Sequence, residues 1–244
     1  MAEWFKDWFD TEEYLYVYRN RNEEDAKNLV ELILSNVELQ PKADILDLAC
    51  GTGRHSILFA NKGFQVTAVD LSRNLLYIAQ KAAEQAHAKI NFIRSDLRQF
   101  SICTRFQLVI NLFTSFGYFE ADEENFKIIK TAYNQLENSG YFVLDYFNRR
   151  FIEKNIVPES INNYSGEIVI QRRRIEGNRV IKQILFEKDG IKKEYHESVR
   201  MYYKDDLLNA ISCAGFKIKT YFGNSDGREF DLENSPRIII IAQK

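Results

Sequence analysis

The stretch Ile45-Leu46-Asp47-Leu48-Ala49-Cys50-Gly51-Thr52-Gly53-Arg54-His55 decides the fold of this chain. It begins as an apolar run typical of a strand, passes into a turn of small residues and continues into a helical pattern that Gly63 closes. Gly51 and Gly53 lack the Cβ atoms that would keep a ligand from the backbone, and the helix presents free N–H groups over the turn. Because Asp47 leaves a carboxylate at the end of the strand, the stretch predicts a site for a nucleotide-like ligand.

The spacing of the glycines separates two kinds of nucleotide site. A dinucleotide fingerprint reads Gly-x-Gly-x-x-Gly, and its third glycine lets the helix pack closely on the strand. Ser56 occupies that third place here, and Asp47 lies four positions before Gly51. The pattern Asp-x-x-x-Gly-x-Gly after an apolar strand resembles motif I of the class I S-adenosylmethionine-dependent methyltransferases. Ala49 replaces the first glycine of that motif, and a residue this small is tolerated there.

The chain beyond this motif alternates strands and helices, as the resemblance implies. The implied fold is α/β: a Rossmann-like, doubly wound, seven-stranded and mostly parallel sheet with a C-terminal antiparallel hairpin. One predicted helix begins at a cap residue, Asp122, and ends at Ser139-Gly140. Strands are predicted at 44–49, 64–70, 89–94, 106–111, 141–147, 216–222 and 237–242.

The pattern changes after the fifth of these strands. Polar and apolar residues alternate over 167–175, 179–187 and 191–203. Turns are predicted between these segments at Glu176-Gly177-Asn178 and at Asp189-Gly190. A small inserted antiparallel β-sheet is therefore predicted between the parallel strands and the last helix.

Three parts of the chain follow from this pattern: an N-terminal helical cap (1–40), a cofactor-binding core (41–150 and 203–244) and the inserted sheet (151–202). We expect the inserted sheet and the long final loop to select the acceptor rather than the cofactor, because ligands of open parallel sheets bind beyond the strands' carboxyl ends. The polar candidates for this role are Arg172, Arg174, Glu194, His196 and Arg200 in the sheet, and Asp226, Arg228, Glu229 and Asp231 in the loop.

The resemblance implies S-adenosyl-L-methionine as the cofactor and assigns residues to it. Asp70, about 20 residues after the glycines, would accept hydrogen bonds from the ribose hydroxyls. As an alternative, Asp70 only starts the next helix, with Ser72 as its cap. Asp96 would accept from the adenine amine, and the unusually apolar loop 112–119 would separate cofactor from acceptor. The implied cofactor-binding residues are Asp47, Ala49, Cys50, Gly51, Thr52, Gly53, Arg54, Asp70, Leu71, Asp96, Leu97, Asn111, Leu112 and Phe113, with Tyr18 from the cap, where Tyr14 and Arg19 are further candidates.

The implied methyl donor is already activated, because its sulfonium needs no nucleophile, metal or redox cysteine from the protein. We therefore expect no metal. An amine acceptor must be neutral when it attacks, so a nearby side chain would remove its proton. Tyr118, Tyr146 and His196 are the catalytic candidates. His196 shares one polar face with Glu194 and Ser198, and a strand that simply faces solvent is the alternative.

The composition is typical of a soluble globular protein without a nucleic-acid surface. Of 244 residues, 45% are hydrophobic and 28% charged, the net charge is −2, and no apolar run approaches the ~20 residues of a membrane span. The run Arg172-Arg173-Arg174 does not form one basic patch on a strand, because neighbouring side chains point to opposite faces. Three widely spaced cysteines and a first segment unlike a secretory signal predict a cytoplasmic protein. No feature indicates the oligomeric state.

The function predicted is methyl transfer from S-adenosyl-L-methionine to nitrogen or oxygen of a small-molecule acceptor. One alternative is an RNA or protein methyltransferase, but the chain has Asn111-Leu112-Phe113-Thr114 where such enzymes carry an Asn-Pro-Pro-Tyr-type motif. From another class, an NAD-dependent oxidoreductase would use the same βαβ unit. Ser56 in place of the third glycine disfavours it. A non-catalytic module that keeps the cofactor site is the remaining alternative.

Overall fold

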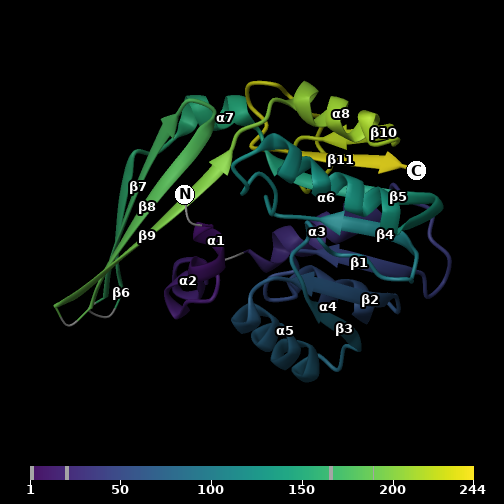
Figure 1. Cartoon of the computed structure of the whole chain (residues 1–244), viewed down its shortest axis with the longest axis horizontal. Coiled ribbons are helices and arrows are strands. Elements are labelled where there is room, and N and C mark those ends of the chain that lie inside the picture. Colours follow the sequence, from purple (N-terminus) through teal and green to yellow (C-terminus); the bar gives the residue numbers. More distant parts are fainter. Residues whose placement is uncertain (1–2, 20–21, 165–166, 189) are drawn as a thin grey trace.

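In the computed structural model, which describes residues 3–19, 22–164, 167–188 and 190–244, a seven-stranded sheet runs through the centre of the molecule (Figure 1). Its strands are β1 (Asp44–Leu48), β2 (Gln65–Asp70), β3 (Ile90–Arg94), β4 (Phe106–Asn111), β5 (Leu136–Phe147), β10 (Lys217–Phe222) and β11 (Arg237–Gln243). They lie in the order β10-β11-β5-β4-β1-β2-β3, with β11 antiparallel to both of its neighbours and the other pairs parallel. The strand order reverses between β1 and β4, which is where open α/β sheets bind ligands.

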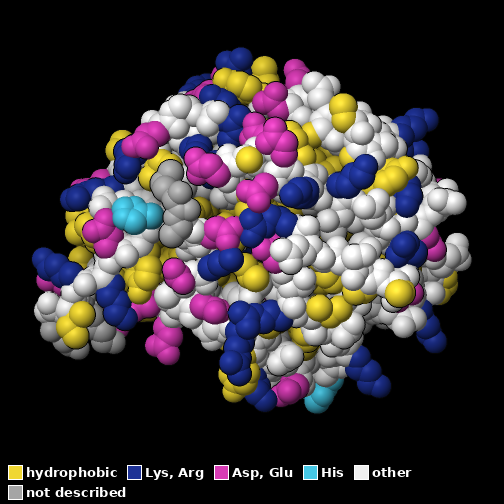
Figure 2. Space-filling view, viewed as in Figure 1, with side chains coloured by type: hydrophobic (Ala, Val, Ile, Leu, Met, Phe, Trp, Pro, Cys, Tyr) yellow, Lys and Arg dark blue, Asp and Glu magenta, His cyan; other side chains and the backbone are white. Residues whose placement is uncertain are grey.

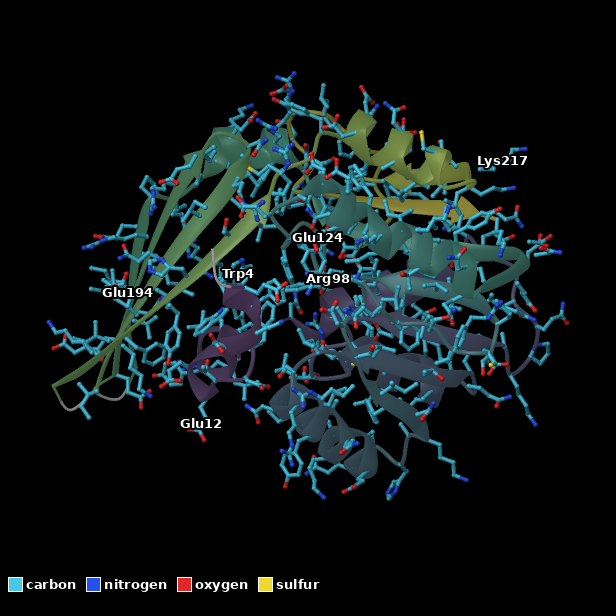
Figure 3. The ribbon with its side chains drawn as sticks, in the orientation of Figure 1. Trp4, Glu12, Arg98, Glu124, Glu194 and Lys217 are labelled. Carbon is cyan, nitrogen blue, oxygen red and sulfur yellow. The ribbon has the colours of Figure 1, made fainter. Side chains whose placement is uncertain are left out.

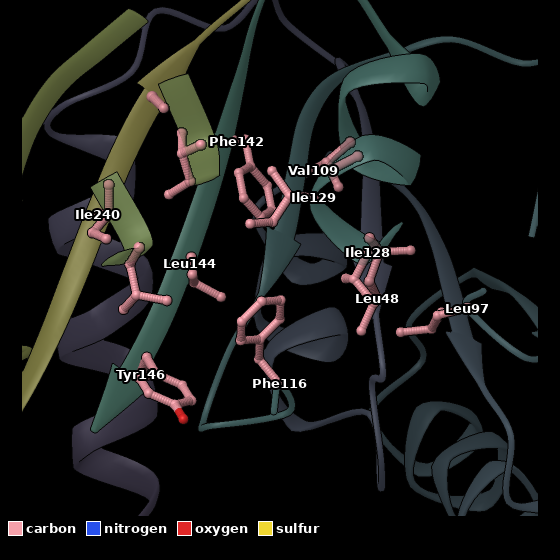
Figure 4. Close-up of a cluster of buried hydrophobic side chains, with 14 of the residues drawn as sticks. Leu48, Leu97, Val109, Phe116, Ile128, Ile129, Phe142, Leu144, Tyr146 and Ile240 are labelled. Atoms are coloured by element: carbon pink, nitrogen blue, oxygen red, sulfur yellow. The ribbon is translucent and has the colours of Figure 1, made fainter. Parts of the chain in front are cut away.

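Helices cover both faces of the central sheet, as the predicted doubly wound fold requires. These helices are α3 (Glu23–Leu34), α4 (Arg54–Asn61), α5 (Arg73–Gln85), α6 (Asp122–Gln135) and α8 (Lys204–Cys213). Strand side chains alternate between the two faces. Phe142 and Leu144 of β5 therefore join α6 and α8 in one core (Figure 4), while Tyr141 and Val143 join α3 and α4 in the other. The predicted fold class is confirmed.

The N-terminal helices stand between the central sheet and the inserted sheet (Figure 1). The elements outside the core are α1 (Trp4–Trp8), α2 (Glu12–Val17), α7 (Arg149–Asn155), β6 (Glu159–Tyr164), β7 (Glu167–Glu176), β8 (Arg179–Lys188) and β9 (Ile191–Arg200). The four strands pair antiparallel in chain order. Trp8 and Tyr14 pack with Val169 and Ile184 of the inserted sheet and with Leu75 of α5. One apolar cluster thus joins the two sheets through the N-terminal segment.

The inserted sheet has more structure than its sequence pattern predicted. The turn at Gly177 is confirmed, with φ at 57° and pairing that continues on both sides. Asp189, named in the second predicted turn, lies outside the described residues. The elements α7 and β6 were missed, because their residues show neither a helical apolar stripe nor a clear alternation.

The start and end of α6 differ from the prediction. The helix was expected to end at Ser139-Gly140, but it ends at Gln135, because Leu136 already pairs with Phe106 of β4. A helix cannot continue where the backbone of the next residue pairs with a neighbouring β-strand.

The residue predicted to cap α6 has a different role. Asp122 is the first residue of the helix, and the N-cap is Ala121. The Asp122 carboxylate instead accepts hydrogen bonds from Arg200 Nε and Nη2, both at 2.8 Å, and from Tyr202 Oη at 2.6 Å. It therefore fastens α6 to the end of β9.

Two general features of the described residues bear on the predicted partners. None of their helices is long and apolar enough to cross a membrane. On the face shown in Figure 2, basic and acidic side chains are interspersed rather than gathered by sign.

Candidate active site

A cavity of about 1000 Å³ lies at the carboxyl ends of β1, β2 and β4. We call it the glycine-loop cavity, after the loop 49–53 at its wall. Its other walls come from the N-terminal segment, through Phe5, Phe9 and Tyr14, and from the loop after β4. Of the predicted residues, Asp47, Ala49, Cys50, Gly51, Thr52, Arg54, Asp70, Leu71, Asp96, Leu97, Leu112, Phe113 and Tyr118 line this cavity.

The two glycines of the loop have different roles. Gly51 lines the cavity at φ 56°, and a Cβ there would meet no protein atom within 4 Å. Gly53 caps α4 at φ 76° and does not line the cavity; a Cβ there would lie 3.0 Å from the Cβ of Ala79 on α5. Gly53 therefore allows close packing of α4 and α5, a role that the sequence pattern did not indicate.

Asp70 holds the glycine loop and the start of α5 together. Its Oδ2 accepts from the backbone N–H of Gly51 at 2.8 Å, and its Oδ1 accepts from that of Ser72 at 2.9 Å. Ser72 Oγ in turn accepts from the Leu75 N–H and caps α5. Because the Gly51 N–H already donates to Asp70, it is not free for a pyrophosphate, as a dinucleotide site would require.

Asp47 is a buried carboxylate that the sequence alone did not explain. It is 2% exposed, and Ser56 Oγ donates to its Oδ2 at 2.6 Å. Ser56 therefore binds the Asp47 carboxylate, and it occupies the position where a dinucleotide fingerprint has its third glycine. Burial raises the pKa of Asp47 to about 7, and burial also raises the pKa of Asp70. Buried carboxylates of this kind favour a cationic ligand.

Asp96 reaches the cavity from the loop after β3 with its charge already paired. Arg98 Nη2 lies 2.6 Å from Asp96 Oδ2, and this pair lowers the pKa of Asp96. Arg98 also pairs with Glu3, at 2.7 Å, and with Glu124 of α6, at 3.1 Å; Arg98 and Glu124 are labelled in Figure 3. One arginine thus ties the N-terminal segment, the loop after β3 and α6 around the cavity.

Three further predicted residues do not line the glycine-loop cavity. Asn111 is fully buried and donates to the carbonyls of Leu48 and Ser115, so it fastens the ends of β1 and β4, while its Oδ1 has no partner among the described residues. Arg19 lies beyond both cavities described here and stacks on Tyr16. Tyr18 lines the neighbouring cavity rather than this one.

That neighbouring cavity, of about 1130 Å³, lies between the inserted sheet, the N-terminal segment and the ends of β5 and β11. We call it the sheet cavity. It shares Phe9, Tyr14, Phe113 and Tyr118 with the glycine-loop cavity, so these side chains form the boundary between the two. Its polar side chains are Tyr18, Thr114, Asp145, Arg173, Lys182, Glu197 and Arg237.

The inserted sheet turns a different face to this cavity from the one expected. Arg173, Lys182 and Glu197 line the cavity, whereas Arg172 pairs with Glu159 and Arg174 with Glu176 away from it. Glu194, labelled in Figure 3, is exposed and pairs with His196, and Arg200 binds Asp122. In the final loop, Pro236 and Arg237 line the cavity, and Asp226, Arg228, Glu229 and Asp231 do not.

Of the three catalytic candidates, the structure brings only Tyr118 to the cavities. Tyr146 is fully buried and donates its hydroxyl to the carbonyl of Arg200; burial raises its pKa, so it is no base. His196 lines neither cavity. Tyr146 was expected near a strand end, but its side chain points into the core. His196 lies along a separate hollow that Trp4, Phe5 and Tyr118 also line.

The inserted sheet also holds the loop that presents Tyr118. The Arg179 guanidinium donates to the carbonyls of Gly117, Tyr118 and Phe119, at 3.1–3.4 Å, and the Arg200 N–H donates to the Gly117 carbonyl at 2.7 Å. On the other side, Trp8 donates to Glu197 of β9 at 2.7 Å. The inserted sheet therefore fastens two walls of the glycine-loop cavity as well as lining the sheet cavity.

The raised pKa of Asp47 makes stability depend on pH. The folded state binds the Asp47 proton more tightly than the unfolded state, whose pKa is about 3.9. Stability from this group is therefore lost as pH rises from about 4 to 7. We expect Asp47→Asn to melt above wild type at pH 8, with the difference shrinking steadily toward pH 4, in thermal scans without ligand. Ser56 can still donate to the amide oxygen. An unchanged difference at both pH values would show that Asp47 does not titrate here.

Comparison with known proteins agrees with this interpretation of the site. Residues 45–140 match the family described as "Methyltransferase domain". A glycine/sarcosine N-methyltransferase of Aphanothece halophytica is 36% identical over 184 residues, which cover 74% of this chain and 68% of that protein. The chain belongs to the S-adenosylmethionine-dependent methyltransferases. Its cofactor is S-adenosyl-L-methionine.

Other relatives agree with this methyltransferase family. A dTDP-3-amino-3,4,6-trideoxy-alpha-D-glucopyranose N,N-dimethyltransferase of Streptomyces venezuelae is 24% identical, covering 84% of this chain and 87% of that one. The chain spans only 49% and 48% of two putative methyltransferases, from Bacillus subtilis (strain 168) and Geobacillus sp. (strain WCH70). The crystal structure of an S-adenosylmethionine-dependent methyltransferase from Clostridium acetobutylicum ATCC 824 shares the fold, with a TM-score of 0.81, 18% identity and coverage of 95% and 97%.

The residues of the glycine-loop cavity fit this cofactor. S-adenosyl-L-methionine carries a sulfonium and an ammonium against one carboxylate, so it is a net cation. The cavity presents the carboxylates of Asp47, Asp70 and Asp96. Its remaining wall is largely apolar, through residues such as Leu71 and Leu97, which suits an adenine ring.

Proposed function

We propose that this methyltransferase methylates an amine nitrogen of a small molecule bound in the sheet cavity. The observation that carries the proposal is the pair of adjoining cavities that share Phe113 and Tyr118 as their boundary. Each is a concave, mostly apolar hollow with a few polar side chains, as small-molecule sites are. A donor in one and an acceptor in the other would meet across that boundary, where the reaction needs near-contact geometry and little water.

The lining of the sheet cavity supports an amine rather than a hydroxyl as the acceptor. The Asp145 carboxylate and the rings of Trp4, Phe9 and Tyr118 attract a cation, through charge and through the ring faces, while the cations of Arg173, Lys182 and Arg237 suit an acidic group on the same molecule. Relatives with N-methyltransferase activity in their names, on glycine and sarcosine and on an amino sugar nucleotide, agree with this preference.

We assign the cofactor contacts as follows. Asp47 binds the ammonium of the methionine part, Asp70 accepts from the ribose hydroxyls with its remaining lone pairs, and Asp96 accepts from the adenine amine while Arg98 holds it. The bound cofactor supplies an activated methyl group on its sulfonium. The protein's part is to bind, to orient and to exclude water, and Tyr118 orients the acceptor at the boundary.

The compartment we propose is the cytoplasm. Cys50, Cys103 and Cys213 are all free thiols, and two of them are exposed, which supports a reducing environment.

The test is transfer of a labelled methyl group from S-adenosyl-L-methionine to a panel of small amines, hydroxy acids and tRNA. We expect label on at least one amine, S-adenosylhomocysteine in equal amount, and no label on tRNA. Calorimetry of the same preparation should give a Kd in the micromolar range for the cofactor, about −8 kcal/mol, and no binding of NAD. Label on tRNA or on hydroxyl groups alone would contradict the proposal.

A further inference from the structure

We infer that Asp145 is the residue that takes the proton from the acceptor amine. The inference rests on the proposed function, and it names a base that sequence patterns did not reveal. Asp145 lies near the carboxyl end of β5 and is 2% exposed, yet it lines the sheet cavity.

The backbone around Asp145 places it at the boundary of the two cavities. Its Oδ2 accepts from the Phe113 N–H at 3.0 Å, and its carbonyl accepts from the Thr114 N–H at 3.0 Å. Phe113 and Thr114 both have positive φ, at 59° and 58°, so these two bonds hold an unusual turn. Since Phe113 lines both cavities, Asp145 lies beside the place where donor and acceptor meet.

One oxygen of this carboxylate remains open to the cavity. Oδ2 contacts Phe113 N and lies 3.5 Å from Arg237 Nη1. Among the described residues none donates a hydrogen bond to Oδ1, and that atom is not sealed in the interior. An amine in the sheet cavity can therefore donate to Oδ1.

The other candidates in the sheet cavity are less suited. Glu197 already accepts from Trp8 and Tyr18 and pairs with Lys182, at 3.6 Å, so its oxygens are occupied. The hydroxyl of Tyr118 is less suited because a neutral phenol oxygen is a far weaker proton acceptor than a carboxylate.

Burial and the surrounding arginines act on the pKa of Asp145 in opposite directions. Burial raises its pKa, and Arg237 opposes this most strongly among the charged groups. Asp25 of α3 raises it and Arg54 of α4 lowers it. Arg237 is itself shared, since its Nη2 donates to Asp25 at 3.1 Å. The other charged or titratable groups that face the sheet cavity are Tyr18, Tyr118, Arg173, Lys182 and Glu197.

The step balances with these groups alone. The acceptor enters as an ammonium, and one N–H proton moves to Oδ1 of Asp145. The freed lone pair on nitrogen forms the new bond to the methyl carbon, while the carbon–sulfur bond breaks and its electron pair stays on sulfur. Asp145 later releases its proton to water, so each turnover gives one methylated ammonium, S-adenosylhomocysteine and one proton.

The test is the pH profile of kcat/KM for Asp145→Asn, with the amine that the transfer assay identifies. Wild type should rise through the pKa of Asp145 and then level off. The variant should lose at least a hundredfold at pH 7 and rise tenfold per pH unit up to the amine's own pKa, because only amine that is already neutral can react. The amide oxygen can still accept from the Phe113 N–H, so calorimetry should give cofactor binding within threefold of wild type.

Variants of two neighbouring residues, Arg237 and Asp25, distinguish a base from a residue that only supports the structure. If Asp145 were only structural, these variants would not shift the pH profile. Arg237→Met should shift the acid limb of the profile to higher pH, and Asp25→Asn should shift it to lower pH. A variant profile parallel to that of wild type, or neighbour variants that leave the acid limb in place, would overturn the role of Asp145. Wild type that methylates no amine would instead overturn the proposed function.

Discussion

Gly51→Ala should abolish binding of S-adenosyl-L-methionine and leave the fold nearly as stable as wild type. The added methyl group meets no protein atom within 4 Å and stands in the glycine-loop cavity that Gly51 lines. A ligand that lies against this backbone has no room for it, and we expect a hundredfold or greater loss of affinity, about 2.7 kcal/mol. The cost to the fold is that of an alanine at φ 56°, about 1 kcal/mol.

Calorimetry with the cofactor and a thermal scan of the free protein measure these two effects. The matched control is Gly177→Ala, in the turn between β7 and β8. This glycine has φ 57° and no atom within 4 Å of a built Cβ, but it lies outside both cavities. It should lose the same stability and bind the cofactor as wild type does. Equal cofactor binding by the two variants would mean that the cofactor does not lie on Gly51.

Gly117→Ala should both destabilise the fold and stop methyl transfer. At φ 88° a Cβ would lie 2.9 Å from the Arg200 carbonyl oxygen and 3.0 Å from the Tyr146 hydroxyl. Neither atom can withdraw, because Tyr146 donates to that carbonyl and the Arg200 N–H donates to Gly117. Strain and overlap together should cost about 2–4 kcal/mol. The loop must also move, and it carries Tyr118 at the boundary of the two cavities.

Thermal scans should show a fall in Tm of about 5–15 °C for Gly117→Ala, larger than that of Gly177→Ala, which shares only the positive φ. Label transfer measured well below the melting range should fall about a hundredfold, since a displacement of 1 Å near the reaction can cost that much. If Gly117→Ala melts at the same temperature as Gly177→Ala and transfers the methyl group at the wild-type rate, the inserted sheet does not position this loop.

Much of the cofactor half of the site was predictable from local sequence. Asp47, Gly51 and Asp70 line one cavity, as expected, because the carboxyl ends of neighbouring parallel strands meet at one edge of a sheet. Most strand boundaries followed from apolar runs, because a strand buried on both faces needs an unbroken apolar sequence. The exception is β5, which begins at Leu136 rather than at the predicted residue 141. These features depend on residues close together in the chain, so the pattern contains the information.

Residue roles that depend on contacts between distant segments were decided by the tertiary structure. Sequence indicated Arg172 and Arg174 for the acceptor side, and Arg173 is the one that lines the cavity. Side chains alternate between the two faces of a strand, and both faces of the inserted sheet carry polar residues. The alternation therefore does not reveal which face lines the cavity. Likewise the position of Tyr146 near the end of a strand did not reveal that its hydroxyl binds the Arg200 carbonyl.

By itself, then, the sequence determined the α/β fold, because strand periodicity is a local property, and the motif around Gly51 implied the cofactor through its resemblance to a family. Only the tertiary structure decided how Asp145 is used. Its partners are the Phe113 N–H, 32 positions away, and Arg237 at the far end of the chain. Burial by those segments, rather than the residue's neighbours in sequence, sets the charge state and the open oxygen of this carboxylate.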